Sequence, residues 1–183
     1  MSEKTKEQTV ELEIPQNVKA KLEGVTLTIE GPMGKTSRPF NHTRISISLE
    51  GSKVVFKYTS KNRRIRAIAI AWMNHVKNMM EGVTHGWRYR MKVVYAHFPL
   101  KISTKGNELI IENFLGEKFP RKVILPEGVN VKIEESNLIL ESVDIEKVGL
   151  AALSIERRTK IKNYDPRVFQ DGIYIYSKAE HIN

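Results

Sequence analysis

Two stretches of this chain that start 82 residues apart align without a gap, "TLTIEGPMGK" (26–35) on "ELIIENFLGE" (108–117). The same offset places a helical pattern at 67–70 over a second one at 149–152. A constant offset between similar segments indicates a duplicated unit. The bland alternative, that any two units of strands and a helix look alike, explains less well why both stretches have a glycine at the same place. We therefore expect two tandem copies of one fold.

The periodicity of apolar residues predicts what each copy contains. Residues alternate between apolar and polar at 18–22, 25–29, 45–49 and 54–58, which is typical of half-buried antiparallel strands. A helical period then begins near Ile65, and we expect Trp72 and Met73 to be buried and Gly82 to end the helix. The second copy repeats this order, with strands at 129–133, 138–140 and 173–176. Its helix has an inner face formed by Val148, Ala151, Ala152 and Ile155.

These patterns predict an α+β fold of two tandem duplicated units. Each unit should be a mainly antiparallel β-sheet packed against one α-helix. The expected domains are residues 1–86 and 87–183.

The positive charge of the chain is concentrated in one stretch. The formal net charge is +9, and residues 57–92 contain nine cationic residues against the single acid Glu81, a net charge of +8. Such a local field indicates a polyanionic partner, which can be nucleic acid, an acidic membrane surface or an acidic protein.

Four of these cations, Lys61, Arg63, Arg64 and Arg66, fall in the first two turns of the expected helix. Cations are unfavourable there because the helix dipole is positive at its N-terminal end. Nearby phosphates would relieve the repulsion, since backbone N–H groups and guanidinium groups would both face them. The alternative is that these side chains only solvate the outer face of the helix. We predict phosphate contacts by Arg63, Arg64 and Arg66.

The remaining motifs give no support for catalysis. Gly34-Lys35-Thr36 lacks the earlier glycine of a P-loop, and the five histidines have no partners at metal-ligand spacing. We expect no enzyme activity, no cofactor, no metal and no small-molecule substrate. The chain has no cysteine, no apolar signal region and no run of about 20 apolar residues, which favours a cytoplasmic protein without a membrane partner.

A second basic cluster follows the second helix. Residues 156–176 interleave five cations with Tyr164 and Phe169, whose rings can stack on bases or riboses. Cations at a helix C-terminus are favourable in any protein, so a purely structural explanation covers the first part of this cluster. The remainder predicts a loop that binds RNA.

Three stretches, "KVVYAHFP" (92–99), "IENFLGEKFPRKV" (111–123) and "DPRVFQDGIYI" (165–175), closely resemble the sixth large-subunit ribosomal protein in its archaeal and eukaryotic-type branch. The resemblance covers roughly residues 9 to 180. It implies a structural constituent of the large ribosomal subunit that binds 23S-type rRNA near the stalk base and the sarcin–ricin region. It also implies neighbouring large-subunit ribosomal proteins as partners, a place in the cytoplasmic ribosome, and no enzyme activity or metal.

Members of that family chiefly use the C-terminal unit for rRNA, which carries over to loop 113–122 and segment 157–170. The rRNA-binding residues expected there are Lys118, Arg121, Lys122, Arg157, Arg158, Lys160, Lys162, Asn163, Tyr164, Arg167 and Gln170. Arg63, Arg64 and Arg66 of the first helix are also predicted to bind rRNA, but they rank after these C-terminal residues. The sequence also leaves open an alternative function, in which the chain is a module that binds a non-ribosomal RNA or an acidic protein.

Overall fold

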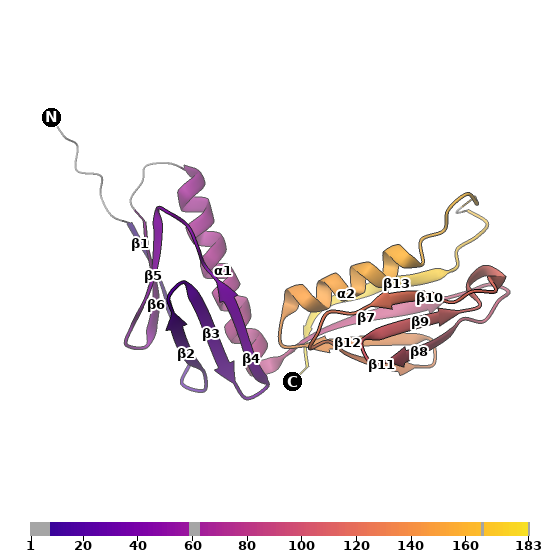
Figure 1. The fold of residues 1–183 in the computed structure, drawn as a ribbon, viewed down its shortest axis with the longest axis horizontal. Helices are drawn as coiled ribbons and strands as arrows, with labels where there is room; N and C mark the ends of the chain where they lie inside the picture. The colour runs from indigo at the N-terminus through magenta and orange to yellow at the C-terminus, as the bar shows by residue number, and fades with distance from the viewer. Residues whose placement is uncertain (1–7, 59–62, 166, 183) are drawn as a thin grey trace. The chain divides into compact units, whose positions relative to one another are not determined.

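The computed structural model describes residues 8–58, 63–165 and 167–182, which form two compact units (Figure 1). Its first unit extends to His85 and its second begins at Gly86. Lys61 lies outside the described residues. Within the described residues, neither helix combines the length and the apolar character that crossing a membrane requires.

The first unit has six strands followed by one helix. They are β1 (Gln8–Glu13), β2 (Lys19–Glu23), β3 (Thr26–Gly31), β4 (Gly34–Pro39), β5 (Ile45–Glu50), β6 (Lys53–Tyr58) and α1 (Arg63–His85). The strands form two antiparallel sheets, ordered β1-β6-β5 and β2-β3-β4. The α+β class is confirmed, but the unit has two small sheets where the sequence predicted one.

The second unit repeats this order and adds a strand. It contains β7 (Trp87–Val94), β8 (Lys101–Lys105), β9 (Glu108–Glu112), the short 3-10 helix η1 (Phe114–Gly116), β10 (Arg121–Ile124), β11 (Asn130–Glu134), β12 (Asn137–Ser142), α2 (Ile145–Arg158) and β13 (Gly172–His181). Its sheets are ordered β11-β12-β7-β13 and β10-β9-β8, again with antiparallel pairs.

The two units share one topology, which confirms the predicted duplication. β7, β12 and β11 correspond to β1, β6 and β5, and β8-β9-β10 correspond to β2-β3-β4. The two helices begin at Arg63 and Ile145, again 82 residues apart. The added strand β13 extends the larger sheet beside β7.

The helix α1 packs its apolar face on both sheets of the first unit. Ile65, Ala69, Val76, Met79, Met80 and Val83 are buried in this face. The predicted burial of Trp72 and Met73 is wrong, because both side chains are half-buried. Trp72 packs edge-on against Phe40 and Phe56, with ring centroids 5.2 Å and 6.1 Å away. A ring of that size commonly keeps an exposed edge, and Met73 lies at the margin of the apolar stripe.

The prediction that Gly82 ends the first helix is also wrong. The helix continues to His85, and Gly82 is buried within it. Gly86 follows with φ +71°, a left-handed conformation that ends helices and that glycine adopts without steric cost.

The helix α2 agrees with the sequence pattern. Its predicted inner face, Val148, Ala151, Ala152 and Ile155, is fully buried. Asp144 precedes the helix, and its carboxylate accepts a hydrogen bond from the backbone N–H of Glu146 at 2.9 Å. This N-cap satisfies a backbone donor that the first turn cannot pair internally.

Candidate nucleic-acid interface

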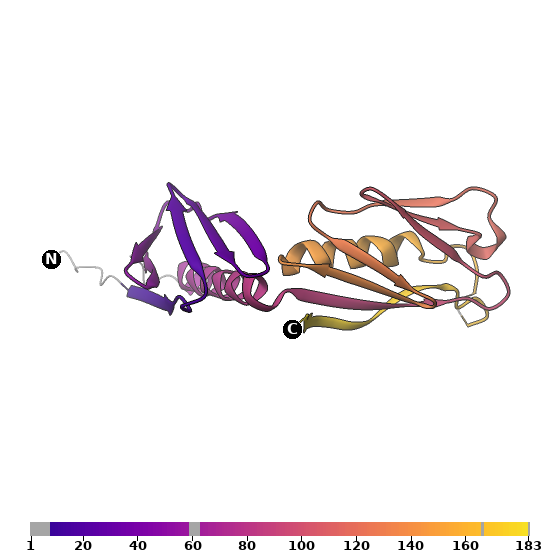
Figure 2. The same cartoon turned by 90° about the horizontal axis from the view of Figure 1, so that it is seen from below.

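Three loops of the second unit lie together at one of its ends, which we call the loop tip (Figures 1 and 2). They are residues 95–100 after β7, 113–120 after β9 and 159–171 after α2, the last described except for residue 166. The Asn113 side chain donates a hydrogen bond to the Pro99 carbonyl at 3.1 Å, and the Ala96 N–H donates to Asp171 at 3.2 Å. These two bonds tie the first loop to each of the others.

The loop tip brings together most of the residues that the sequence predicted for rRNA binding. Those with exposed side chains are Lys118, Arg157, Arg158, Lys160, Lys162, Asn163, Tyr164, Arg167 and Gln170. Arg157 and Arg158 belong to the last turn of α2, where the helix dipole favours cations. Asn163 has φ +65°, a left-handed conformation that asparagine tolerates better than most residues.

The carboxylates of this region hold the backbone in place. Asp165 accepts the Arg167 N–H at 2.9 Å, and Glu156 accepts the Ile175 N–H at 3.3 Å. Within the described residues, no carboxylate forms an ion pair with the exposed cations Lys118, Arg157, Lys160, Lys162 and Arg167. The loop tip and the adjoining end of α2 therefore present exposed cations that form no ion pair among the described residues.

Arg121 differs from the other predicted residues because its guanidinium is bound within the protein. It donates to both carboxylate oxygens of Glu117, at 2.8 and 2.5 Å, and to the Arg158 carbonyl at 2.7 Å. The same group lies 4.0 Å from the centre of the Phe114 ring, in cation–π contact. The hydrogen bonds from Arg121 lower the pKa of Glu117 below its usual value. Arg121 thus joins loop 113–120 to the end of α2.

Lys122 lies on β10 with its side chain exposed. Its ammonium is 3.6 Å from a carboxylate oxygen of Glu108 on the adjacent strand β9. Exposed pairs of this kind contribute little to stability.

A cavity of about 540 Å³ opens between loop 113–120 and the segment from Arg157 to Tyr164. Its rim holds the rings of Phe119 and Tyr164, which are 84% and 56% exposed. The Tyr164 ring also packs on Phe169, with centroids 4.8 Å apart. Sequence reasoning missed Phe119, although its position between Lys118 and Pro120-Arg121 in a loop was a usable signal.

The three arginines of the first helix lie in the other unit. Arg63, Arg64 and Arg66 are exposed, and the first turn of α1 contains no acidic residue, as predicted. The structure therefore does not bring them together with the C-terminal residues in one unit.

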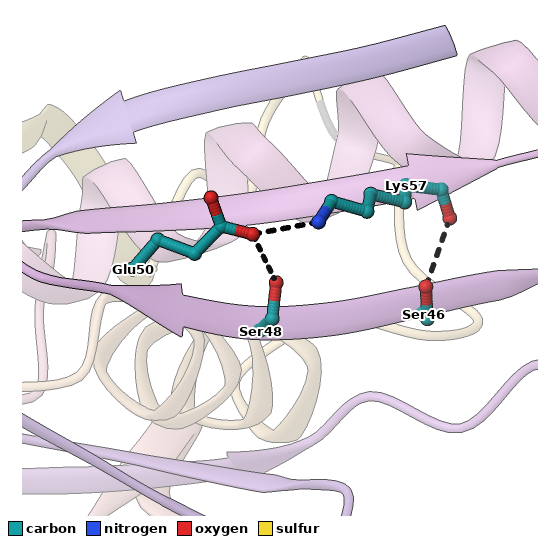
Figure 3. A network of polar contacts seen from close by, with 4 residues as sticks. All are labelled: Ser46, Ser48, Glu50 and Lys57. Carbon is teal, nitrogen blue, oxygen red and sulfur yellow. Dashed lines mark hydrogen bonds and ion pairs between the residues drawn. The ribbon is translucent and has the colours of Figure 1, made fainter. Parts of the chain in front are cut away.

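Tertiary ion pairs with carboxylates outside residues 57–92 involve three of the nine cations of this stretch. Lys57 pairs with Glu50 at 2.6 Å on the sheet β1-β6-β5, where Ser48 also donates to Glu50 (Figure 3). Arg88 pairs with Glu141 at 2.7 Å, and Arg90 pairs with Glu180 at 2.9 Å. A window of sequence cannot show these partners, because all three carboxylates lie outside it. These three ion pairs reduce the excess charge of this stretch, but most of it remains in the folded chain.

Metal binding finds no support in the part of the chain that the structure describes. Within residues 8–58, 63–165 and 167–182, no three His, Asp or Glu side chains are grouped so that they could hold a metal ion.

Comparison with known proteins gives consistent matches along the chain. The family model for ribosomal protein L6 matches residues 14–86 and 98–172, one segment in each unit. The large ribosomal subunit protein uL6 of Sulfurisphaera tokodaii is 43% identical over 169 residues, which cover 92% of this chain and 91% of the relative. The protein of the same name from Haloarcula marismortui is 41% identical over 169 residues, covering 92% and 95%.

Proposed function

The chain belongs to the ribosomal protein L6 family, and we propose that its loop tip binds large-subunit rRNA near the stalk base and the sarcin–ricin region. The family consists of structural, non-enzymatic proteins of the large ribosomal subunit. The chain is accordingly a cytoplasmic ribosomal protein that associates with large-subunit rRNA and with other ribosomal proteins.

One observation supports the loop tip as the rRNA-binding surface, namely exposed cations that form no ion pair within the described part of the chain and lie beside exposed aromatic rings. Lys160 and Lys162 can neutralise phosphates, which supply most of the affinity of proteins for nucleic acid. Tyr164 and Phe119 can stack on unpaired bases, which is how proteins commonly recognise single-stranded segments of RNA. If these charged side chains only interacted with solvent, the exposed aromatic rings beside them would have no role.

The arginines of α1 fit a different kind of contact. Arg63 and Arg66 are exposed in the first two turns of α1, where the helix dipole is positive and the first turn contains no acidic residue. We propose that they touch phosphates without reading sequence, since phosphate contacts fix position and base contacts fix specificity.

The test compares two double variants with the same loss of charge. Arg158→Ala with Lys162→Ala should weaken binding to an rRNA fragment containing the sarcin–ricin region much more than binding to random RNA. Arg63→Ala with Arg66→Ala should weaken both about equally. Binding is measured at one salt concentration, because affinity for RNA depends steeply on salt. Circular dichroism verifies that both variants are folded.

Two results would contradict the proposed interface. The site is wrong if the α1 pair controls discrimination between the two RNAs while the C-terminal pair has no effect. The chain would act as a module for another RNA or an acidic protein if it failed to sediment with large ribosomal subunits through a high-salt gradient.

A further inference from the structure

Phe119 is the most exposed large apolar side chain among the described residues, with 84% of its surface in water. In the same loop, Phe114 is 1% exposed and packs in the core of the second unit. The loop therefore buries one ring and presents the other. A single exposed ring is common on protein surfaces, but here two exposed aromatic rings, Phe119 and Tyr164, line the same cavity.

We infer that the cavity beside Phe119 binds a single unstacked nucleotide of the RNA, with the base against Phe119 or Tyr164 and a phosphate held by Arg157, Lys160 or Lys162. This inference rests on the proposed rRNA-binding function and adds to it a defined pocket. The volume of about 540 Å³ lies within the range of about 300–1,000 Å³ that is usual for small-ligand pockets.

The wall of the pocket is ordered before any ligand arrives. Arg121 fixes it through Glu117 and through the Arg158 carbonyl, at 2.5–2.8 Å. Asn113 and Leu115 have φ of +61° and +50°, and a left-handed leucine is uncommon. Backbone strain of this kind persists where the surrounding structure enforces it, and it is frequent at binding sites. A wall fixed in this way loses little entropy when a ligand binds.

The charges of the pocket favour a nucleotide over an acidic protein segment. The one carboxylate in its lining, Glu117, is hydrogen-bonded to Arg121, while Arg157, Lys160 and Lys162 form no ion pair with a carboxylate among the described residues. An acidic peptide would use these cations but would leave the two exposed rings without a function. A nucleotide uses both, because its phosphate is anionic and its base has an aromatic face.

The nucleotide must be unpaired. Bases in an A-form helix are stacked on their neighbours, and their faces are closed to protein side chains. Bases in loops and bulges can be turned outward and stacked on aromatic rings. The expected ligand is therefore an unpaired nucleotide of the large-subunit rRNA.

Phe119→Ala tests the pocket against a matched control, Ile124→Ala. Ile124 is 76% exposed on β10 and does not line the cavity. Phe119→Ala should weaken binding to purified large-subunit rRNA by about 5- to 150-fold, the range that stacking of one base on an aromatic ring provides. Ile124→Ala should bind like the unaltered protein, and Phe119→Tyr should restore the affinity. Both truncated side chains are exposed, so neither change should affect folding.

Ultraviolet cross-linking followed by mass spectrometry identifies the nucleotide. Phe119 or Tyr164 of the unaltered protein should be linked to one unpaired nucleotide. An abasic residue at that position should weaken binding as much as Phe119→Ala does, and the two changes together should add little further. Such coupling is expected of groups in contact.

These experiments distinguish a failure of the nucleotide pocket from a failure of the proposed rRNA-binding function. If the unaltered protein binds rRNA but Phe119→Ala binds equally well and cross-links form only elsewhere, the pocket is refuted and the rRNA interface is retained. If the unaltered protein does not bind large-subunit rRNA, the proposed function itself is wrong.

Discussion

Arg121 and Lys122 are neighbours in the sequence and have the same charge, but they lie in different surroundings. The Arg121 guanidinium makes hydrogen bonds to Glu117 and to the Arg158 carbonyl, so few of its donors remain for RNA. The Lys122 ammonium has one exposed partner at 3.6 Å. Both remain predicted rRNA-binding residues, but Arg121 contributes first by positioning the loop. The planar guanidinium suits this role, since it can engage a carboxylate with two parallel bonds.

Arg121→Ala should lower the free energy of unfolding by about 1–2 kcal/mol, because it removes charge-assisted hydrogen bonds that are partly exposed to solvent. Lys122→Ala is the matched control and should cost less than about 0.5 kcal/mol. Urea unfolding followed by circular dichroism measures both. Equal losses for the two variants would contradict the positioning role of Arg121.

The stabilisation from the Arg121–Glu117 pair should decrease as the pH falls. The hydrogen bonds from Arg121 lower the pKa of Glu117 in the folded protein below its ordinary value of 4.5. The stabilisation is therefore fully present above that value and is lost as the pH falls through the lower, folded-state pKa. The difference between the unaltered protein and Arg121→Ala should shrink accordingly in acid.

Among the elements, α1 shows that a helical pattern predicts the direction of a face better than the depth of its burial. Ala69 and Val76 are fully buried, whereas Trp72, between them on the same face, is half-buried. The depth of burial of a residue depends on which side chains lie opposite its turn of the helix. Trp72 lies opposite the rings of Phe40 and Phe56.

Trp72→Ala should cost about 2–3 kcal/mol, less than the cost of about 3–5 kcal/mol for a fully buried aromatic residue. Ile70→Ala, on the exposed side of the same helix, should cost below about 1 kcal/mol. Chemical unfolding monitored by circular dichroism compares the two. A loss below about 1 kcal/mol for Trp72→Ala would mean that the ring contributes no packing.

Across the whole molecule, the net charge of +9 does not show where the proposed binding surface lies. Three cations of the most basic window of the sequence, residues 57–92, pair with carboxylates outside it, whereas residues 93–183, which have a net charge of zero, contain the loop tip. Most of their thirteen acids lie elsewhere in the unit, and Asp165 and Asp171 at the tip accept backbone N–H groups, so Lys118, Lys160, Lys162 and Arg167 form no ion pair among the described residues.

If about five cations neutralise phosphates, the slope of log affinity for rRNA against log salt concentration should lie between about −3.5 and −4.5. The double variant Arg158→Ala with Lys162→Ala should have a slope shallower by about 1.4–1.8. Filter binding across a salt series gives both values. A flat response of the unaltered protein would exclude phosphate contacts as the main source of affinity.

Periodicity and repeats in the sequence predicted the two units, about half of their antiparallel strands and the buried face of α2, because the side that a residue faces depends on its neighbours in the chain. They indicated no strand at β1, β7, β8 or β10. The same evidence predicted no strand at β4, whose residues Gly34–Pro39 are mostly polar and form a strand only because β3 pairs with them. Neither the periodicity nor the repeats predicted which acidic residue each basic residue pairs with. Arg88 meets Glu141, 53 residues away, only because strand register places β7 beside β12. The pocket beside Phe119 likewise depends on the tertiary structure, which brings loop 113–120 close to the segment from Arg157 to Tyr164.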